Sequence, residues 1–503
     1  MRMELQFRLL GLLAALALLL VRTSTASPLN LTSSILRARL SKNATVLDHK
    51  DAGFAAASAR WTTYSGPTFS IVVEVATEQD VAETVAYASS RGIPFLAQSG
   101  GHGYSTTLSS IQDGIMVSLR RLSHTHYDNA TAKVQVGGGI KSGDLAQAVH
   151  QYGRELPLGD SGCTGALGVA LGGGHNPLQG KWGLLADSLD SARLVLHNGS
   201  ILDVSAATHA DLWWALRGAG QNYGVVVSAV FRTHPQTPGG LHYQLSGVYA
   251  ADKIELLLPV LEALRLVLPR ELAIYLAFTS DPDTLQPIIR LRLLYAGPRS
   301  AALPFVEPLL ALNFTSHAED VVPWPRLLDA SASTCAKGFR KSIFAANMAT
   351  LDARAVLRVW RAWAALLRRH PDAASTVLGF DVLPQQGVLL AAAAAAAGGP
   401  HAAGAVPFRA RSAVLAVLGL QWTDDALLPA LDAAGRSMRA ALREGAGYAR
   451  AQLPLYQNYG RGDEPLRALY GYDEGALAEL ARLKREYDPR EVFSAYHGIP
   501  LRW

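Results

Sequence analysis

Short apolar runs alternate with amphipathic stretches over residues 66–238. Residues 71–75 form a Val- and Ile-rich run that predicts a buried strand, and the apolar positions Val81, Val85 and Ala88 then recur at the spacing of one helix face. The same patterns predict strands at 93–97, 133–136, 201–204 and 223–230 and a helix at 144–151. We therefore expect residues 66–238 to form one α+β domain.

The pattern changes after residue 238. Residues 239–455 carry longer Leu-, Ala- and Arg-rich helices with strands such as 288–294 and 377–382 between them, and we expect a second domain that shapes a substrate pocket. The alanine run 391–397 stands among Gly and Pro residues and predicts a low-complexity loop. Residues 456–503 form a C-terminal segment with clustered aromatic residues and a predicted helix at 474–486.

The N-terminus has the composition of a secretory signal. Arg2 and Arg8 precede the uncharged run 9–21, and small residues follow up to position 26. That run is shorter than the roughly 18–20 residues that span a bilayer, so we expect a cleaved signal peptide at 1–26 and no transmembrane anchor. An N-terminal segment, 27–65, would then precede the first domain. Five Asn-x-Ser/Thr sequons agree with a secreted glycoprotein: Asn30, Asn43, Asn129, Asn198 and Asn313.

Charge and composition exclude some function classes. The 503 residues carry a formal net charge of only +5, and no block of like charges occurs. Because nucleic-acid phosphates are bound by clustered Lys and Arg, we expect no nucleic-acid partner. No group of His, Cys and Asp residues has the spacing of metal ligands, so we expect no metal site.

The chain has only two cysteines, Cys163 and Cys335. One interpretation is a disulfide that closes a very long loop. The other is a chemical role for Cys163, which lies in the glycine-dense stretch 159–168, where the backbone can approach a ligand closely. The residues alone leave both open.

Two further glycine-rich segments indicate a flat or phosphorylated ligand. The segment 137–143 lacks the G-x-G-x-x-G spacing of a Rossmann dinucleotide site. The segment 97–105 is more specific, because its successive glycines let backbone N–H groups close around a pyrophosphate, with His102 at the tip of the loop.

In these motifs and others the sequence resembles the berberine-bridge-enzyme-like flavoproteins, which share the vanillyl-alcohol-oxidase type of FAD-binding fold. Residues 99–102 match the family's S-G-G-H loop, and 162–174 match its cysteine- and glycine-rich loop, with Leu167 where valine is usual. The other matching segments are 211–218, 224–226, 456–459 (Y-x-N-Y) and 487–493 (Y-D-P-x-x-x-F). Gln98, Gly103 and Trp182 depart from the family pattern, where Arg, Ser and Tyr are frequent.

The resemblance implies a fold and a cofactor. The fold would be α+β, with a two-lobed FAD-binding domain of the PCMH type, an α/β substrate domain on an antiparallel sheet, and a C-terminal segment that returns to the FAD domain. The cofactor would be FAD with two covalent bonds, from His102 to the 8α carbon and from Cys163 to C6, which excludes a Cys163–Cys335 bridge in any molecule with both bonds. The residues expected to bind it are Ser99, Gly100, Gly101, His102, Gly103, Gly162, Cys163, Gly168, Gly172, Gly173, Gly174, Asp187, Gly224, Val226 and Asn458.

The chemistry requires hydride transfer to the flavin and a base for the accompanying proton. By resemblance Tyr459 is the leading base, and because an ordinary tyrosine has a pKa of about 10, its phenolate would need stabilisation by donors or positive charge. Tyr456 and Asn458 are its expected neighbours, and Asp381, on a predicted strand, is the second candidate base. For His175 we favour a hydrogen-bonding role.

Three functions remain open. The first is an oxidase of a small organic molecule, such as a secondary metabolite, that reduces O2 to hydrogen peroxide. The second is an oxidase of a sugar or oligosaccharide, for which Trp324, Trp360, Trp363 and Trp422 would be candidate platforms, although tryptophan in such helices more often packs in the core. The third is a secreted flavin-binding protein without catalysis. We favour the first.

Overall fold

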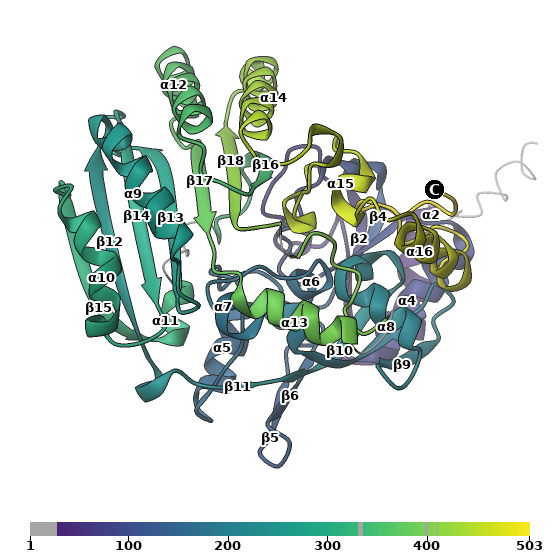
Figure 1. The fold of residues 1–503 in the computed structure, drawn as a ribbon. Helices are drawn as coiled ribbons and strands as arrows, with labels where there is room; N and C mark the ends of the chain where they lie inside the picture. Colours follow the sequence, from purple (N-terminus) through teal and green to yellow (C-terminus); the bar gives the residue numbers. More distant parts are fainter. Residues whose placement is uncertain (1–27, 330–334, 398–400, 410) are drawn as a thin grey trace, which may run out of the picture.

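The structure is a computed structural model that describes residues 28–329, 335–397, 401–409 and 411–503. The predicted signal peptide, residues 1–26, lies outside the described residues. Figure 1 shows the large sheet on the left and the smaller sheets on the right, with the C-terminal helices α15 (Leu466–Tyr470) and α16 (Glu474–Tyr487) beside the smaller sheets. Among the described residues, no helix is both long and apolar enough to cross a bilayer.

The first lobe is a four-stranded sheet in the order β1-β2-β4-β3. Strands β2, β4 and β3 run parallel, and β1 pairs antiparallel with β2. The Thr77 hydroxyl caps the first turn of helix α4 in a reciprocal capping box, and Gly92 ends the helix in the left-handed conformation. The elements are β1 Thr45–Asp48, β2 Phe69–Glu74, β3 Phe95–Gln98, β4 Gly114–Ser118, α2 Pro28–Arg39, α3 Phe54–Ser58 and α4 Glu78–Arg91.

The second lobe is a five-stranded antiparallel sheet in the order β5-β6-β10-β8-β9. Its core joins the sheet to helices α5, α6 and α8 and to the C-terminal helix α16. The elements are β5 Thr125–Asp128, β6 Lys133–Gly137, β8 Leu189–Val195, β9 Ile201–Ser205, β10 Val225–Arg232, α5 Ser142–His150, α6 Ala166–Leu171, α7 Gln179–Trp182 and α8 Ala210–Ala219. A short ribbon, β7 (Arg154–Glu155) with β11 (His234–Pro235), borders it.

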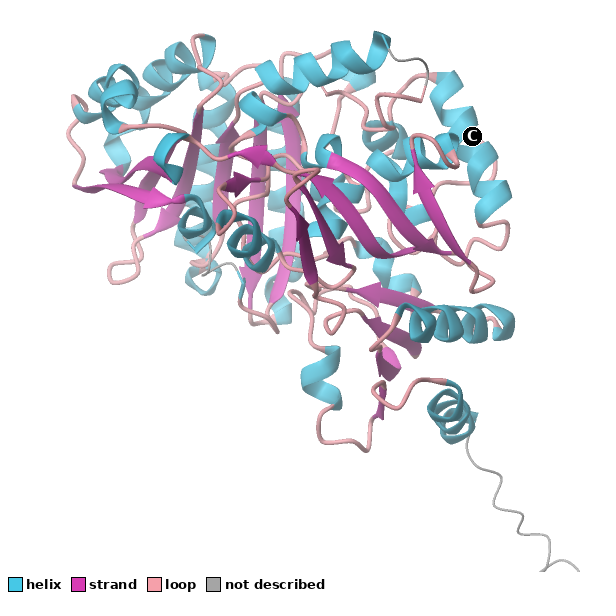
Figure 2. Cartoon of the chain, turned by 90° about the horizontal axis from the view of Figure 1, so that it is seen from below, coloured by secondary structure: helices cyan, strands magenta, loops and turns pink. Residues whose placement is uncertain are grey.

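Residues 241–422 build a seven-stranded antiparallel sheet in the order β15-β12-β14-β13-β17-β18-β16. Its strands are β12 Leu241–Ala250, β13 Leu272–Ser280, β14 Pro287–Tyr295, β15 Ser316–Pro323, β16 Arg340–Met348, β17 Val377–Val382 and β18 Val414–Trp422. Its helices are α9 Ile254–Leu266, α10 Arg299–Leu310, α11 Trp324–Asp329, α12 Ala353–Arg369, α13 Gln386–Ala397 and α14 Leu428–Glu444. Figure 2 shows these strands from below, with helices along the outer side.

The two faces of the large sheet have different neighbours because side chains alternate along each strand. Ile274, Leu293, Val382 and other alternate residues pack with helices α9, α10, α12 and α14 in one apolar core. The intervening positions, such as Tyr275, point to the opposite face and pack against the first two lobes and the C-terminal segment. We call this second face the lobe face.

The predicted α+β architecture is confirmed, and most predicted strands and helices are present within one or two residues. The alanine run 391–397 was wrongly predicted as a loop, because it forms the C-terminal half of helix α13. Alanine has the highest intrinsic helix propensity. Tertiary contacts also hold this helix, since Gln386 Nε2 donates to the Leu268 carbonyl at 2.7 Å and Gly387 packs against the backbone of α7.

Candidate active site

The two loops that were predicted to hold the cofactor lie against each other. The loop after β3, residues 99–103, contacts the loop before α6 at backbone distance. A Cβ atom added at Gly100 would lie 2.6 Å from the Gly165 nitrogen and 2.8 Å from the Cys163 oxygen. The contact therefore requires glycine at position 100. The second loop is held in turn by Gly143, whose N–H donates to the Gly162 carbonyl at 2.9 Å.

Several polar atoms at this junction are buried with no hydrogen-bond partner among the described residues. They are Ser99 Oγ, His102 Nε2 and Gln98 Nε2. Buried polar groups in folded proteins are nearly always paired, so these atoms indicate a ligand. A flavin dinucleotide fits them, because glycine loops offer backbone N–H groups to phosphate and an imidazole nitrogen can bond a ring substituent.

The His102 imidazole is held in its neutral form. Burial, together with the positive charges of Lys337, Lys341, Arg60 and Lys141, lowers its pKa to about 4. Trp61 stacks on the imidazole at a centroid distance of 5.9 Å. A neutral imidazole keeps the nitrogen lone pair that a covalent bond to a cofactor needs.

Arg60 was not among the predicted site residues. Its guanidinium is buried, with Nη1 donating to Gln98 Oε1 and Nη2 to the Gly103 carbonyl, both at 2.6 Å. It thus places a positive charge beside Gln98, the position where the family frequently has Arg. Sequence reasoning missed it because Arg60 lies outside the matched motifs, and only the missing Arg at position 98 indicated that a cation was needed from elsewhere.

Cys163 is bonded to Cys335 in a disulfide. The predicted second flavin bond, from Cys163 to C6, is therefore absent from this covalent state, and the alternative that the residues left open is the one observed. The two cysteines are 172 positions apart in sequence, with Cα atoms 5.9 Å apart. The residues alone left this pairing as one of two interpretations, and the tertiary fold brings the two cysteines together.

A row of polar side chains crosses the lobe face of the large sheet. Arg292 on β14 is the direct partner of Tyr275 on β13, and Tyr275 is the direct partner of Asp381 on β17. Direct cross-strand partners project to the same face. The row continues through Leu415 to Asn347. The side-chain Oδ1 of Asn347 accepts from the Tyr456 backbone N–H at 3.0 Å, which fixes the C-terminal segment on this face.

The two candidate bases lie together. The Tyr459 hydroxyl donates to Asp381 Oδ2 at 3.1 Å, across a sequence separation of 78 residues. Burial and the charge of Asp160 raise the pKa of Asp381 to about 7. Burial raises the pKa of Tyr459 well above its usual value, and Asp381 and Asp160 add to this effect. The phenolate stabilisation expected for Tyr459 is not found among the described residues, so Asp381 is the group that can accept a proton near neutral pH.

Tyr456 and Asn458 support this pair. The buried Tyr456 hydroxyl accepts from Asn458 Nδ2 at 2.8 Å and from the His175 backbone N–H at 3.3 Å. Burial raises the pKa of Tyr456 to about 12, so it acts as a packed hydroxyl. His175 Nδ1 lies 2.9 Å from Gln179 Oε1, the hydrogen-bonding role that was favoured for it.

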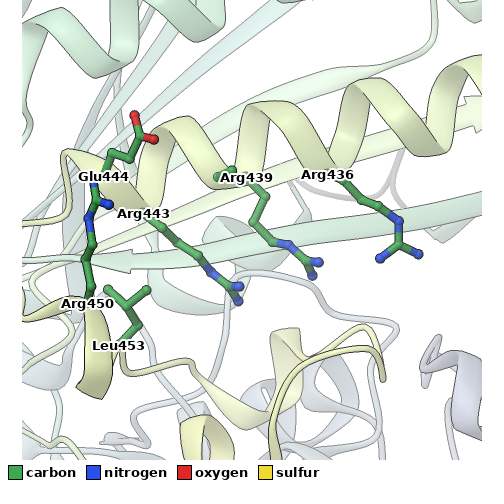
Figure 3. Close-up of a pocket in the computed structure, with 7 residues that line it drawn as sticks. Arg436, Arg439, Arg443, Glu444, Arg450 and Leu453 are labelled. Carbon is green, nitrogen blue, oxygen red and sulfur yellow. The ribbon is translucent and has the colours of Figure 1, made fainter.

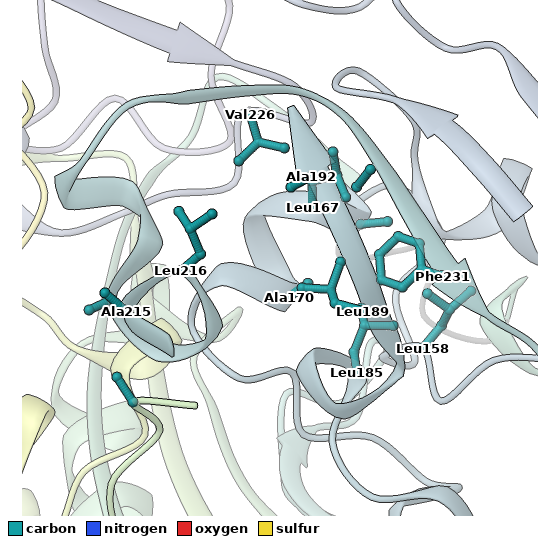
Figure 4. Packing of buried hydrophobic residues seen from close by; sticks show 14 of the residues in the cluster. Leu158, Leu167, Ala170, Leu185, Leu189, Ala192, Ala215, Leu216, Val226 and Phe231 are labelled. Carbon is teal, nitrogen blue, oxygen red and sulfur yellow. The ribbon is translucent and has the colours of Figure 1, made fainter. Parts of the chain in front are cut away.

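The other predicted cofactor residues lie in several environments. Gly172 packs directly against the Asn458 side chain, while Gly173 and Gly174 have positive φ angles. Asp187 forms a 2.6 Å ion pair with Arg409. Gly224 directly precedes β10, and Val226 lies on β10 in the apolar core shown in Figure 4. Gly168 lies on an exposed side of α6. Gly101, Gly103 and Gly162 belong to the two contacting loops.

A separate pocket of about 320 Å³ lies along the C-terminal half of α14 and the segment that follows it (Figure 3). It is lined by Arg436, Arg439, Ala440, Arg443, Glu444, Arg450 and Leu453. Arg436 and Arg439 are engaged with Asp463, an ion-pair cluster that connects α14 to the C-terminal segment. None of the predicted site residues lines this pocket.

Comparison with known proteins identifies the family of the chain. Residues 69–205 match the family model described as FAD binding domain, and residues 455–500 match the one described as berberine and berberine like. FAD-linked oxidoreductase OXR1 of Pyricularia oryzae is 31% identical over 451 residues, which cover 88% of this chain and 86% of that protein.

Two solved structures show the same fold. Physcomitrella patens BBE-like 1 has a TM-score of 0.80 at 22% identity and covers 93% of this chain and 99% of its own. Glucooligosaccharide oxidase of Acremonium strictum, described with a 6-S-cysteinyl, 8α-N1-histidyl FAD, has a TM-score of 0.75 at 18% identity and covers 93% of this chain and 98% of its own. Fold, motifs and relatives agree, and the chain belongs to the berberine-bridge-enzyme-like family of FAD-linked oxidoreductases.

Proposed function

We propose that the protein is an oxidase that transfers a hydride from a small organic substrate to FAD. FAD, when bound, would supply the hydride acceptor, and its reoxidation by O2 would give hydrogen peroxide. The observation that carries the proposal is the Tyr459–Asp381 hydrogen bond on the lobe face of the large sheet.

Tyr459 and Asp381 would carry the substrate proton away from the reacting carbon's hydroxyl or amine group. The Tyr459 hydroxyl gives its proton to Asp381 Oδ2 as it takes one from the substrate hydroxyl or amine, so the tyrosine never has to persist as a phenolate. This relay suits the charges of the site, because a carboxyl group with a pKa of about 7 can both accept and release a proton near neutral pH. Asn347 and Asn458 hold the segment that carries Tyr459 in place.

A small polar substrate is favoured over an oligosaccharide. The four tryptophans considered as sugar platforms are all buried: Trp324, Trp363 and Trp422 are at most 1% exposed, and Trp360 is 8% exposed. They pack in the cores and cannot stack on a sugar. The polar groups on the lobe face are instead Arg292, Tyr275 and Asp381, which can hydrogen-bond to hydroxyl or amine groups of a compact molecule.

We infer that FAD is attached to His102, whose neutral imidazole and unpartnered Nε2 leave a nitrogen available for the bond. Ser99 and the glycines of both loops would bind the phosphates. Cys163 would form the second bond, to C6, only in molecules in which its bridge to Cys335 is open.

We also propose that the protein matures in the secretory pathway. A disulfide persists in oxidising compartments. The sequons Asn43, Asn129, Asn198 and Asn313 are exposed, as glycosylation would require.

To test this, the purified flavoprotein is mixed under anaerobic conditions with two panels of compounds. One panel contains small alcohols, amines and phenols, and the other contains oligosaccharides. We expect members of the first panel to bleach the flavin absorbance, and admission of air to restore it with one peroxide per turnover. Bleaching by oligosaccharides alone would replace the substrate class, and reduced flavin that persists in air would make the protein a dehydrogenase.

A further inference from the structure

The sulfur atom of Cys163 is already bonded to Cys335, and the chain has no third cysteine that could exchange with either. The resemblance gives that same sulfur to the flavin. One sulfur cannot form both bonds, so the two covalent states exclude each other.

The fold brings Cys335 to Cys163 by contacts that do not depend on the bridge. On the N-terminal side, the end of α11 packs on the Cys163 loop, where a Cβ atom added at Gly162 would lie 3.7 Å from Leu328 Cβ. This contact places Leu328, seven residues before Cys335, beside the Cys163 loop.

On the C-terminal side, the chain after Cys335 is held by the segment that precedes the first domain. The Gly338 N–H donates to the Arg60 carbonyl at 3.2 Å, the Thr63 N–H donates to the Phe339 carbonyl at 3.0 Å, and the Lys341 N–H donates to Thr62 Oγ1 at 2.9 Å. Lys341 Nζ also lies 4.2 Å from the centre of the Trp61 ring, which stacks on His102. Contacts on both sides of Cys335 in the sequence therefore hold it next to Cys163.

Both reactions of the Cys163 thiol release two protons and two electrons. The disulfide forms from two thiols, and a protein or small-molecule disulfide of an oxidising compartment takes the electrons and becomes a dithiol. The thioether forms from the thiol and the C6–H bond of the flavin, and O2 takes the electrons and becomes hydrogen peroxide. Because the fold holds Cys335 next to Cys163, the disulfide has its reaction partner in place as soon as the chain folds.

We propose that the mature protein retains the Cys163–Cys335 disulfide and holds FAD by a single covalent bond, from His102, so that Cys335 determines the number of flavin bonds. The proposal rests on the proposed function for the His102 bond only. It assigns Cys335 a role that no sequence motif indicates, which is to occupy the sulfur that would otherwise form the second bond.

The test is mass spectrometry of the wild-type flavoprotein, alkylated and digested without reduction, beside the Cys335→Ser variant. In the wild type we expect a disulfide-linked peptide pair, flavin on the His102 peptide and none on the Cys163 peptide. In Cys335→Ser we expect flavin on both peptides, with a changed visible spectrum of the acid-precipitated protein. Cys163→Ser is the matched control, since it also lacks the bridge but cannot gain the second bond.

The outcomes separate the two proposals. Two results from the wild-type protein alone would overturn the inference. One is flavin on Cys163 with an alkylated Cys335, and the other is alkylation of both thiols. Folded Cys335→Ser that still has flavin only on His102 would overturn the role of Cys335. A disulfide-linked peptide pair with no flavin on the His102 peptide would refute the single covalent bond, because the proposed attachment to His102 would be wrong. The peptide that differs from expectation, that of His102 or that of Cys163, therefore tells the two failures apart.

Discussion

Asp381→Asn should make the protein more stable at alkaline pH while it removes the proton acceptor of the site. Asp381 is enclosed between Tyr459, to which it is hydrogen-bonded, and Tyr275, its partner on the adjacent strand. Burial and the charge of Asp160 raise its pKa from 3.8 to about 7. The amide of asparagine has the same shape and can still accept the Tyr459 hydroxyl hydrogen.

The magnitude follows from the linkage between protonation and folding. In the unfolded chain the carboxyl group ionises near pH 4, so well below about pH 4 it is protonated in both states and has no effect on stability. Between about pH 4 and about pH 7 the unfolded chain ionises while the folded protein keeps the proton, so the cost to the folded state grows over this range and is complete above about pH 7. A tenfold change in an ionisation constant is worth about 1.4 kcal/mol, so the raised pKa costs the folded wild type about 4 kcal/mol at about pH 8. The variant is spared this cost.

The assay is urea unfolding of wild type and variant at about pH 4 and about pH 8, followed by tryptophan fluorescence. We expect the variant to gain about 2–4 kcal/mol at the higher pH and almost nothing at the lower one. Asp320→Asn, on the exposed strand β15 of the same sheet, is the matched control and should show no such gain. Equal stability of Asp381→Asn and wild type at both pH values would refute the assignment of Asp381 as a destabilised, buried base.

Three other predictions test other parts of the site. With the disulfide intact, His102→Ala should release all flavin into the supernatant after acid precipitation, and flavin retained in the pellet would show that another residue binds it. Tyr459→Phe should slow flavin reduction by substrate about 10²–10⁴-fold with little change in substrate binding, measured by anaerobic stopped-flow, and an unchanged rate would exclude the tyrosine from proton transfer. Lys484 Nζ forms a fully buried 2.6 Å ion pair with Asp488, so Lys484→Met should destabilise the protein by about 3–5 kcal/mol in thermal unfolding. Arg485 is exposed, so Arg485→Met should cause no such loss. Similar losses in both variants would contradict the stabilising role of the buried ion pair.

Sequence patterns predicted the strands and helices well because each pattern reports local burial. Residues 377–382 were predicted as a strand and form β17, and the predicted helix 474–486 is α16 with one additional residue. The error at 391–397 has a physical cause. A run of alanines has no amphipathic pattern, and packing of Gln386 and Gly387 on neighbouring segments holds α13 in place.

Some features of the site could be predicted only in part. Sequence reasoning named His102, Tyr459 and Asp381, and the structure brings Tyr459 and Asp381 into contact. It ranked Tyr459 first as the base, and in the proposed relay Tyr459 takes the substrate proton while Asp381 accepts the proton of the tyrosine hydroxyl. The proton affinity of Asp381 depends on burial and on the charge of Asp160, which act through space and leave no mark in the local sequence.

The sequence by itself determined the family, the fold class and the two loops that meet at His102, because glycine positions and apolar periodicity are local requirements. Only the tertiary structure decided which carboxyl group is placed to accept a proton, that Arg60 supplies a cation beside Gln98, and that Cys163 is paired with Cys335. Each of these depends on strand register or on contacts between segments far apart in the chain. Residues 172 positions apart become neighbours only when the sheet and both lobes have packed together.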